Sequence, residues 1–299
     1  MKTKFQIGST LFLLAIYLIF QSYLESVQYI ICAIAILTFG IPHGAIDHVL
    51  HQKFTKQKKP SNTKQFITWY VLCMLAYLAI WILVPFKALL LFIALGVYHF
   101  GQEFMEELGL EKHSKISFLL WGSTILLMPM LYNYADTVAY MQTALGAELP
   151  EFSDRTSIIL SLSIPIISIV HFSILYQKNQ IAKAKFSQIL LHIIAWTIIF
   201  LSVPFLVGFT LYFVLFHSIN SMDHQYRSLT KLSGKYNLKQ YFKDVSILTL
   251  VSYLGIIFLF LVLDLENWQH LTLYMLIFIS VLTLPHMLVF EEFYENRLS

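Results

Sequence analysis

Residues 186–222 read FSQILLHIIAWTIIFLSVPFLVGFTLYFVLFHSINSM and contain no Asp, Glu, Lys or Arg. A helix crosses the ~30 Å hydrocarbon core of a membrane with about 20 apolar residues, so this run is too long for one crossing. Ser202-Val203-Pro204 lies near its middle. A proline interrupts a helix because it lacks a backbone donor and clashes with the preceding turn. The run therefore predicts two membrane-spanning helices that meet at this proline.

Other stretches free of these four charged residue types divide the rest of the chain in the same way. They are 5–24, 26–46, 65–86, 88–102, 116–135, 156–177, 245–263 and 267–290. The second is expected to continue past Asp47 to about Leu50, and 88–102 is the shortest. We therefore expect an all-α, polytopic transmembrane helix bundle of about eight to ten spans. Residues 1–299 would form a single integral-membrane domain.

The composition supports a membrane protein and excludes several other classes. Of the residues, 58% are hydrophobic and only 12% are charged, whereas a soluble domain carries about 25% charged residues. The net charge of +3 is too small to indicate a nucleic-acid partner. The two cysteines, Cys32 and Cys73, lie far apart in apolar runs and predict neither a disulfide framework nor a thiolate metal site.

The basic residues between the apolar stretches indicate how the chain is oriented across the membrane. If the chain starts in the cytoplasm, 18 of its 20 Lys and Arg residues fall on the cytoplasmic side, and only Lys87 and Arg155 fall on the other. Cytoplasmic loops normally carry this excess. We therefore expect a multi-pass protein of the cell (inner) membrane with both termini in the cytoplasm.

Four of the eleven histidines share one depth in this topology. His43, His99, His217 and His286 lie in four different stretches that run in the same direction, each a few residues before the cytoplasmic end. Polar groups inside a bilayer are costly and often mark a working site. Imidazole is a good ligand for transition metals, and helix bundles build metal sites in their cores. We predict that these four histidines bind a metal, with His224 as an alternative fourth ligand.

Two carboxylates follow two of these histidines at helical spacing. Asp47 is four residues after His43, and Glu103 is four residues after His99, so each would share its histidine's face. Metal-bound histidines usually donate their second N–H to a carboxylate. We predict that Asp47 and Glu103 orient the ligands, with direct ligation by Asp47 as an alternative. Glu103 also lies where a cytoplasmic loop should begin, and Gly101 would let a neighbouring helix approach closely.

Two further histidines, His171 and His192, lie in apolar stretches without polar neighbours. We expect both to be hydrogen-bonded packing residues rather than metal ligands.

The predicted ligand set limits which kinds of metal site are compatible with the sequence. A site of histidines lacks the thiolates of structural zinc and the oxygen cages of calcium or magnesium. It would leave coordination positions open, as oxygen activation requires. The chain contains no G-x-S-x-G elbow, Walker loop or G-x-G-x-x-G sequence. A water-poor interior rich in aromatic side chains suits a lipophilic substrate.

Four motifs, in order, resemble one known family. Residues 40–47 read GIPHGAID, 98–101 read YHFG, 216–218 read FHS and 285–287 read PHM. Together they are similar to the Brp/Blh family of bacteriorhodopsin-related membrane proteins, which act as β-carotene dioxygenases. The resemblance implies an Fe(2+) enzyme that uses O2 to split the central double bond of a carotenoid, β-carotene. The products would be two molecules of all-trans-retinal, and an opsin would be a potential partner receiving retinal.

The sequence departs from the family pattern at one position. The resemblance assigns His43, His99 and His217 as iron ligands. The family commonly shows H-S-x-x-H, with a further ligand where this chain has Ser221. Either His286 completes the site, or His224 does, or three histidines remain.

Two other kinds of protein would also explain buried histidines. One is another lipid-oxidising iron membrane enzyme, and the other is a histidine-containing transporter or a haem-binding membrane protein.

Overall fold

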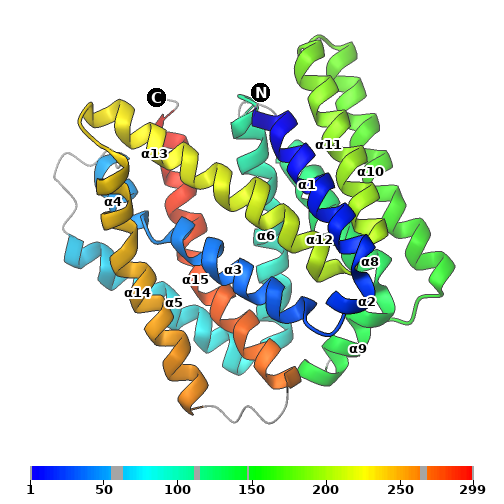
Figure 1. Ribbon diagram of the computed structural model, residues 1–299, viewed down its shortest axis with the longest axis horizontal. Helices are drawn as coiled ribbons and strands as arrows, with labels where there is room; N and C mark the ends of the chain where they lie inside the picture. The colour runs from blue at the N-terminus through cyan, green and yellow to red at the C-terminus, as the bar shows by residue number, and fades with distance from the viewer. Residues whose placement is uncertain (1, 55–62, 111–114, 147, 263–267, 298–299) are drawn as a thin grey trace. The chain divides into compact units, whose positions relative to one another are not determined.

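The computed structural model describes residues 2–54, 63–110, 115–146, 148–262 and 268–297, and all regular structure in these ranges is helical (Figure 1). In chain order the elements are α1 (Lys2–Ile19), α2 (Gln21–Leu24), α3 (Gln28–Gly44), α4 (Asp47–Phe54), α5 (Thr63–Leu83), α6 (Pro85–Glu107), α7 (Lys115–Ile125), α8 (Leu127–Tyr132), α9 (Tyr134–Leu145), α10 (Asp154–Gln177), α11 (Lys183–Ser202), α12 (Phe205–Tyr212), the π-helix η1 (Phe213–Ser218), α13 (Ile219–Ser233), α14 (Leu238–Val262) and α15 (Trp268–Arg297).

Eight helical stretches among the described residues are long and apolar enough to cross a membrane. They are Gln28–Phe54, Lys64–Leu83, Pro85–Glu107, Asp154–Gln177, Lys183–Ser202, Phe205–Ser233, Leu238–Phe258 and Leu273–Glu291. The short predicted stretch 88–102 is part of a full-length helix, α6. The apolar part of α1, Gln6–Ile19, is shorter than the other eight. These helices confirm the predicted all-α polytopic bundle.

Prolines lie at or near two of the breaks between helices. The predicted break at Ser202-Val203-Pro204 is confirmed, because α11 ends at Ser202 and α12 begins at Phe205. The stretch 116–135 is interrupted, since α7 ends at Ile125 and α8 begins after Leu126, and its prediction as one span stays a prediction. Pro129 cannot donate a hydrogen bond to the carbonyl four residues earlier, that of Ile125, and its ring crowds that carbonyl.

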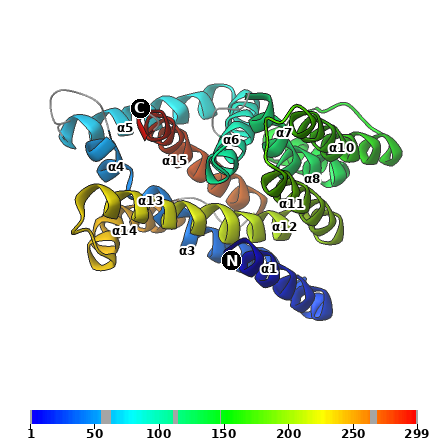
Figure 2. The same ribbon diagram turned by 90° about the horizontal axis from the view of Figure 1, so that it is seen from above.

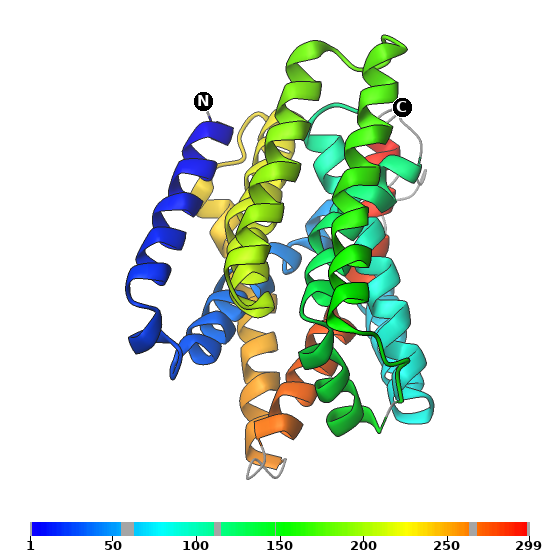
Figure 3. The ribbon, with the colours of Figure 1, turned by 90° about the vertical axis from the view of Figure 1, so that its right-hand side faces the viewer.

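The chain divides into two compact units, and the first is residues 1–37, 96–141 and 148–218. Its core is built of apolar side chains from α6, α7, α11 and α12. The helices α10 and α11 run side by side in it (Figure 3). A Cβ added at Gly101 on α6 would collide with the backbone carbonyl of Phe118, and one at Gly122 would collide with that of Val97. Glycine on both helices therefore lets α6 and α7 approach closely, as predicted for Gly101.

The second unit is residues 38–95, 142–147 and 219–299. Its helices α5 and α15 lie side by side (Figure 2). A second apolar cluster, which includes Ile46, Leu50, Tyr241 and Phe290, forms its core. The expectation of a single domain over the whole chain stays a prediction.

Candidate metal centre

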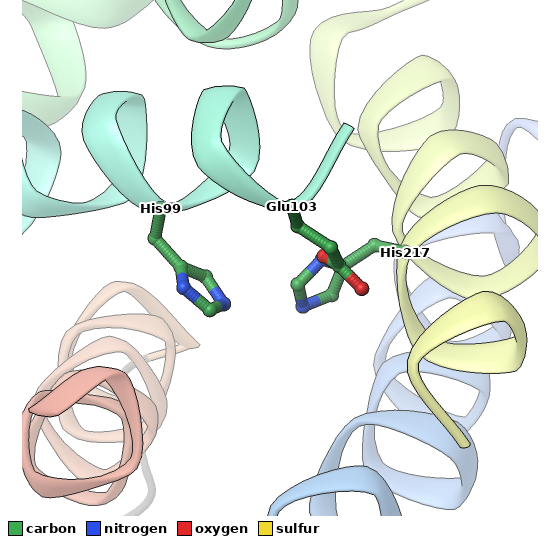
Figure 4. Close-up of side chains that lie close together, drawn as sticks. All are labelled: His99, Glu103 and His217. Carbon is green, nitrogen blue, oxygen red and sulfur yellow. The ribbon is translucent and has the colours of Figure 1, made fainter. Parts of the chain in front are cut away.

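Two helical segments bring His99, Glu103 and His217 together in the first unit. His99 and Glu103 lie on α6, and His217 lies on η1. One potential ligand atom from each side chain lies within 4.8 Å of the other two. All three residues are buried, with exposed fractions of 4%, 8% and 2%. Figure 4 shows the side chains directed into a common space from the two segments.

Local helix geometry explains these positions. His99 and Glu103 are four residues apart on one uninterrupted helix, so both project from the same face. His217 lies in the π-helix Phe213–Ser218. Such wide turns are rare and are frequently found at functional sites. The sequence analysis did not predict this π-helix, because no local sequence pattern distinguishes it from an α-helix.

Aromatic rings make the surroundings of the group apolar. The His99 and His217 ring centroids are 5.2 Å apart. Phe100 and Phe213 place their ring centroids 4.8 Å and 5.1 Å from that of His217. The carboxylate of Glu103 pairs with Nδ1 of His217. A carboxylate beside Nδ1 favours the tautomer with the proton on Nδ1, which leaves the lone pair of Nε2 for a metal.

The donor set fits a divalent transition metal. Two histidines and one carboxylate with open positions are the ligand set of non-haem Fe(II) oxygenases. The oxygen Oε1 of Glu103 is buried and has no hydrogen-bond partner among the described residues. Leaving a buried carboxylate oxygen unsatisfied is costly, and metal ligation would remove this cost. Glu103 therefore suits direct ligation as well as the predicted orienting role.

A small cavity adjoins the group. Its volume is about 10 Å³, which is room for about one water molecule. The lining residues are Glu103, Phe104, Glu107, Tyr212, Phe216 and His217. The cavity therefore touches two members of the candidate metal group and one further carboxylate.

The second unit gathers two other predicted ligands around Asp47. Nδ1 of His286 lies 2.9 Å and 3.0 Å from the two carboxylate oxygens of Asp47. The Tyr70 hydroxyl donates to Oδ2 of the same carboxylate over 3.1 Å. The rings of His43 and His286 lie 4.7 Å apart at 88°. Carboxylate–histidine pairs fix the orientation of metal-bound imidazoles, so Asp47 has the arrangement expected of an orienting residue.

The histidine that Asp47 contacts differs from the predicted one. The four-residue spacing predicts that Asp47 shares a helix face with His43, but the hydrogen bond goes to His286. The reason is that α3 ends at Gly44 and α4 begins at Asp47, so the two residues do not share one continuous helix. The side-chain direction of Asp47 is therefore set by α4 and by its packing against α15.

A second buried network, which the sequence analysis missed, surrounds Gln225. Its side-chain amide donates to the backbone carbonyl of His43 over 2.8 Å and to the hydroxyl of Ser221 over 3.1 Å. The Tyr241 hydroxyl donates to Oε1 of Gln225 over 2.7 Å. Ser221 therefore serves as a hydrogen-bond acceptor within its helix. The one feature of the sequence that could have indicated this network is Gln225 itself, a glutamine four residues after Ser221 and so on the same helix face.

The predicted ligands thus fall into two groups. Among the described residues, the metal-compatible group contains His99 and His217. His43 and His286 lie together in the second unit. His224 lies half-buried on α13 and, in the described part of the chain, is not a member of the metal-compatible group. A single metal shared by all four predicted histidines stays a prediction.

The two histidines expected to pack differ from each other. Nε2 of His171 lies 2.9 Å from the Ser117 hydroxyl, which confirms a hydrogen-bonded role. His192 is buried among aromatic rings, with the Phe104 and Phe216 centroids 5.2 Å and 5.4 Å away. Neither of its ring nitrogens has a hydrogen-bond partner among the residues that the structure describes, so the predicted hydrogen bond is wrong for His192.

Comparison with known proteins gives one consistent result. A family model described as beta-carotene 15,15'-dioxygenase matches residues 34–294. A beta-carotene 15,15'-dioxygenase from the uncultured marine bacterium 66A03 is 22% identical over 271 residues, covering 87% of this chain and 92% of the relative. No solved structure matches the chain. Because the family model spans most of the chain and all the clustered histidines, the protein belongs to the beta-carotene 15,15'-dioxygenase family.

Proposed function

We propose that this protein cleaves the central 15,15' double bond of β-carotene with O2 and forms two molecules of retinal. The carbon–carbon double bond breaks, and each new aldehyde takes one oxygen atom from O2. The observation that carries the proposal is the buried His99–Glu103–His217 group in a chain of this family. The name of the similar protein from the marine bacterium gives the same bond and the same substrate.

The proposed cofactor is Fe(2+), with His99 and His217 as ligands and Glu103 as a ligand or as the residue that orients His217. When bound, the iron would supply the redox chemistry that activates O2. The protein's part is to hold the imidazoles in one tautomer and to keep water away. The contact between the Glu103 carboxylate and Nδ1 of His217 supports one tautomer, because a carboxylate favours the ring form whose proton lies on the facing nitrogen. Phe100, Phe213 and neighbouring rings do the second.

The surroundings of the group suit a hydrocarbon substrate. β-Carotene is insoluble in water and dissolves in the lipid bilayer, where the eight apolar helices would be embedded. Aromatic side chains packed around the group, including Phe100, Tyr212 and Phe216, make its surroundings apolar. We propose entry of the carotenoid from the bilayer, a location in the cell (inner) membrane with cytoplasmic termini, and an opsin as acceptor of the retinal.

Expression in carotene-accumulating cells tests the activity. Cells with the wild-type protein should lose their colour and accumulate retinal, whereas cells with His217→Ala should keep their pigment. His171→Ala is a matched control, because that histidine lies in the same unit and is hydrogen-bonded to Ser117 away from the group. Persistent pigment despite folded, iron-loaded wild-type protein would overturn the proposal. Oxygen consumption with an acyl or sterol substrate alone would point to another lipid oxygenase.

A further inference from the structure

The cavity beside the candidate metal centre also touches a carboxylate outside the metal group. Glu107 lines it together with Glu103 and His217. Glu107 is the last residue of α6 and is exposed, whereas Glu103 is buried. The two are four residues apart on one helix and therefore stand one turn, about 6 Å, apart. The cavity thus adjoins both a buried carboxylate and one that solvent can reach.

The size of the cavity limits how a metal ion can pass it. It has room for about one water molecule, so a fully hydrated divalent ion does not fit. An ion can enter only as its water ligands are exchanged for protein oxygens. The buried oxygen Oε1 of Glu103, which has no hydrogen-bond partner in the described part of the chain, is available for that exchange. The exposed Glu107 carboxylate is positioned to contact the ion first, before the ion reaches Glu103.

The negative charges at the cavity also favour the movement of a metal ion from solvent toward Glu103. The walls of the cavity include the Phe104, Tyr212 and Phe216 side chains, and the carboxylates of Glu103 and Glu107 are its acidic groups. Low-polarity walls focus the field of such charges and raise the local concentration of a cation. A divalent ion about 6 Å from one carboxylate in water is attracted enough to change its capture rate by roughly tenfold.

We propose that Glu107 is the entry residue of the metal centre, capturing a divalent transition-metal ion from water and passing it through the cavity to Glu103 and His217. This inference rests on the proposed function, because it presumes that His99, Glu103 and His217 bind the metal. Glu107 itself is not a ligand in the final site.

The rate of metal uptake tests the proposal. Metal-free, full-length protein in phosphatidylcholine nanodiscs is mixed with Co²⁺, whose visible absorption reports ligation and which does not oxidise in air as Fe²⁺ does. Glu107→Gln should slow the association of Co²⁺ about tenfold, with the final occupancy at saturating Co²⁺ unchanged. Added salt should slow the wild type more than Glu107→Gln, because salt screens the charge. Glu106→Gln is the matched control, since Glu106 carries the same charge on the same turn and does not line the cavity; it should load at the wild-type rate.

The outcomes separate this inference from the proposed function. Loading of Glu107→Gln at the wild-type rate, with His217→Ala unable to bind Co²⁺, would overturn the entry role and leave the metal centre standing. Equal slowing of Glu106→Gln and Glu107→Gln would also overturn it, because it would show a general effect of surface charge. Failure of the wild type to bind Co²⁺ would overturn both the metal centre and its entry residue.

Discussion

The contact between α6 and α7 at Gly101 gives a sharp test of how the fold positions the site. An added Cβ at Gly101 would meet the carbonyl oxygen, the carbonyl carbon and the Cα of Phe118. These are backbone atoms, so no side-chain rotation can relieve the clash and the two helices must separate. His99 and Glu103 lie two residues to either side of Gly101 on α6, so their positions would change with the helix.

The expected change in the free energy of unfolding for Gly101→Ala follows from two opposing effects. Overpacking costs about 1–3 kcal/mol, with rigid neighbours at the upper end, while replacing a helical glycine by alanine gains up to about 1 kcal/mol. We expect Gly101→Ala to lower the free energy of unfolding by about 2 kcal/mol. At about 2–4 °C per kcal/mol, the midpoint should fall by roughly 4–8 °C. Metal occupancy and retinal formation should fall as well.

The assay uses the buried Cys32 thiol, which becomes reactive only when the surrounding helices separate. Temperature-dependent thiol labelling in a Cys73→Ser background gives the unfolding midpoint. Gly8→Ala is the matched control, because a Cβ there meets nothing within 4 Å. Gly8→Ala should keep or slightly raise the midpoint. Equal midpoints for the two variants would refute the argument that close backbone contact at Gly101 holds α6 in place.

Two further predictions concern the buried polar groups. Asp47→Leu takes the carboxylate from the buried His286 ring and removes one of the two acceptors of the Tyr70 hydroxyl, which also reaches the Leu282 carbonyl, and should lower the free energy of unfolding by about 3 kcal/mol. Tyr70→Phe should cost only about 1 kcal/mol, and equal costs for the two variants would contradict the network. His192→Phe loses no hydrogen bond seen in the described residues and should leave thermal stability unchanged or raise it. His171→Phe removes a side-chain hydrogen bond and should lower thermal stability. A larger loss of stability for His192→Phe than for His171→Phe would contradict this prediction and show that His192 has a partner.

Much of the fold is predictable because the bilayer limits it to apolar helices. Runs without charged residues identify the spans, and a proline such as Pro204 marks a break. Pro129 was an equally good signal of the interruption at Leu126 within the predicted span 116–135. The π-helix around His217 had no such signal.

The candidate site was predictable in its residue types but not in its pairings. Helical spacing correctly brought His99 and Glu103 to one face. It could not show that the Glu103 carboxylate pairs with His217 or that Asp47 pairs with His286, because both contacts join distant segments. The Gln225 network was missed for the same reason. Periodicity describes one helix at a time, whereas ligand orientation depends on how helices pack.

The central claim is that His99, Glu103 and His217 hold a catalytic metal, and the metal content of the purified protein tests it most directly. Wild-type protein reconstituted with Fe²⁺ without oxygen should bind a stoichiometric amount, and His171→Ala should bind the same amount. His217→Ala should bind at least about tenfold more weakly, since losing even a residue that orients a ligand costs 10–100-fold in affinity. Undiminished iron binding by His217→Ala would contradict the account.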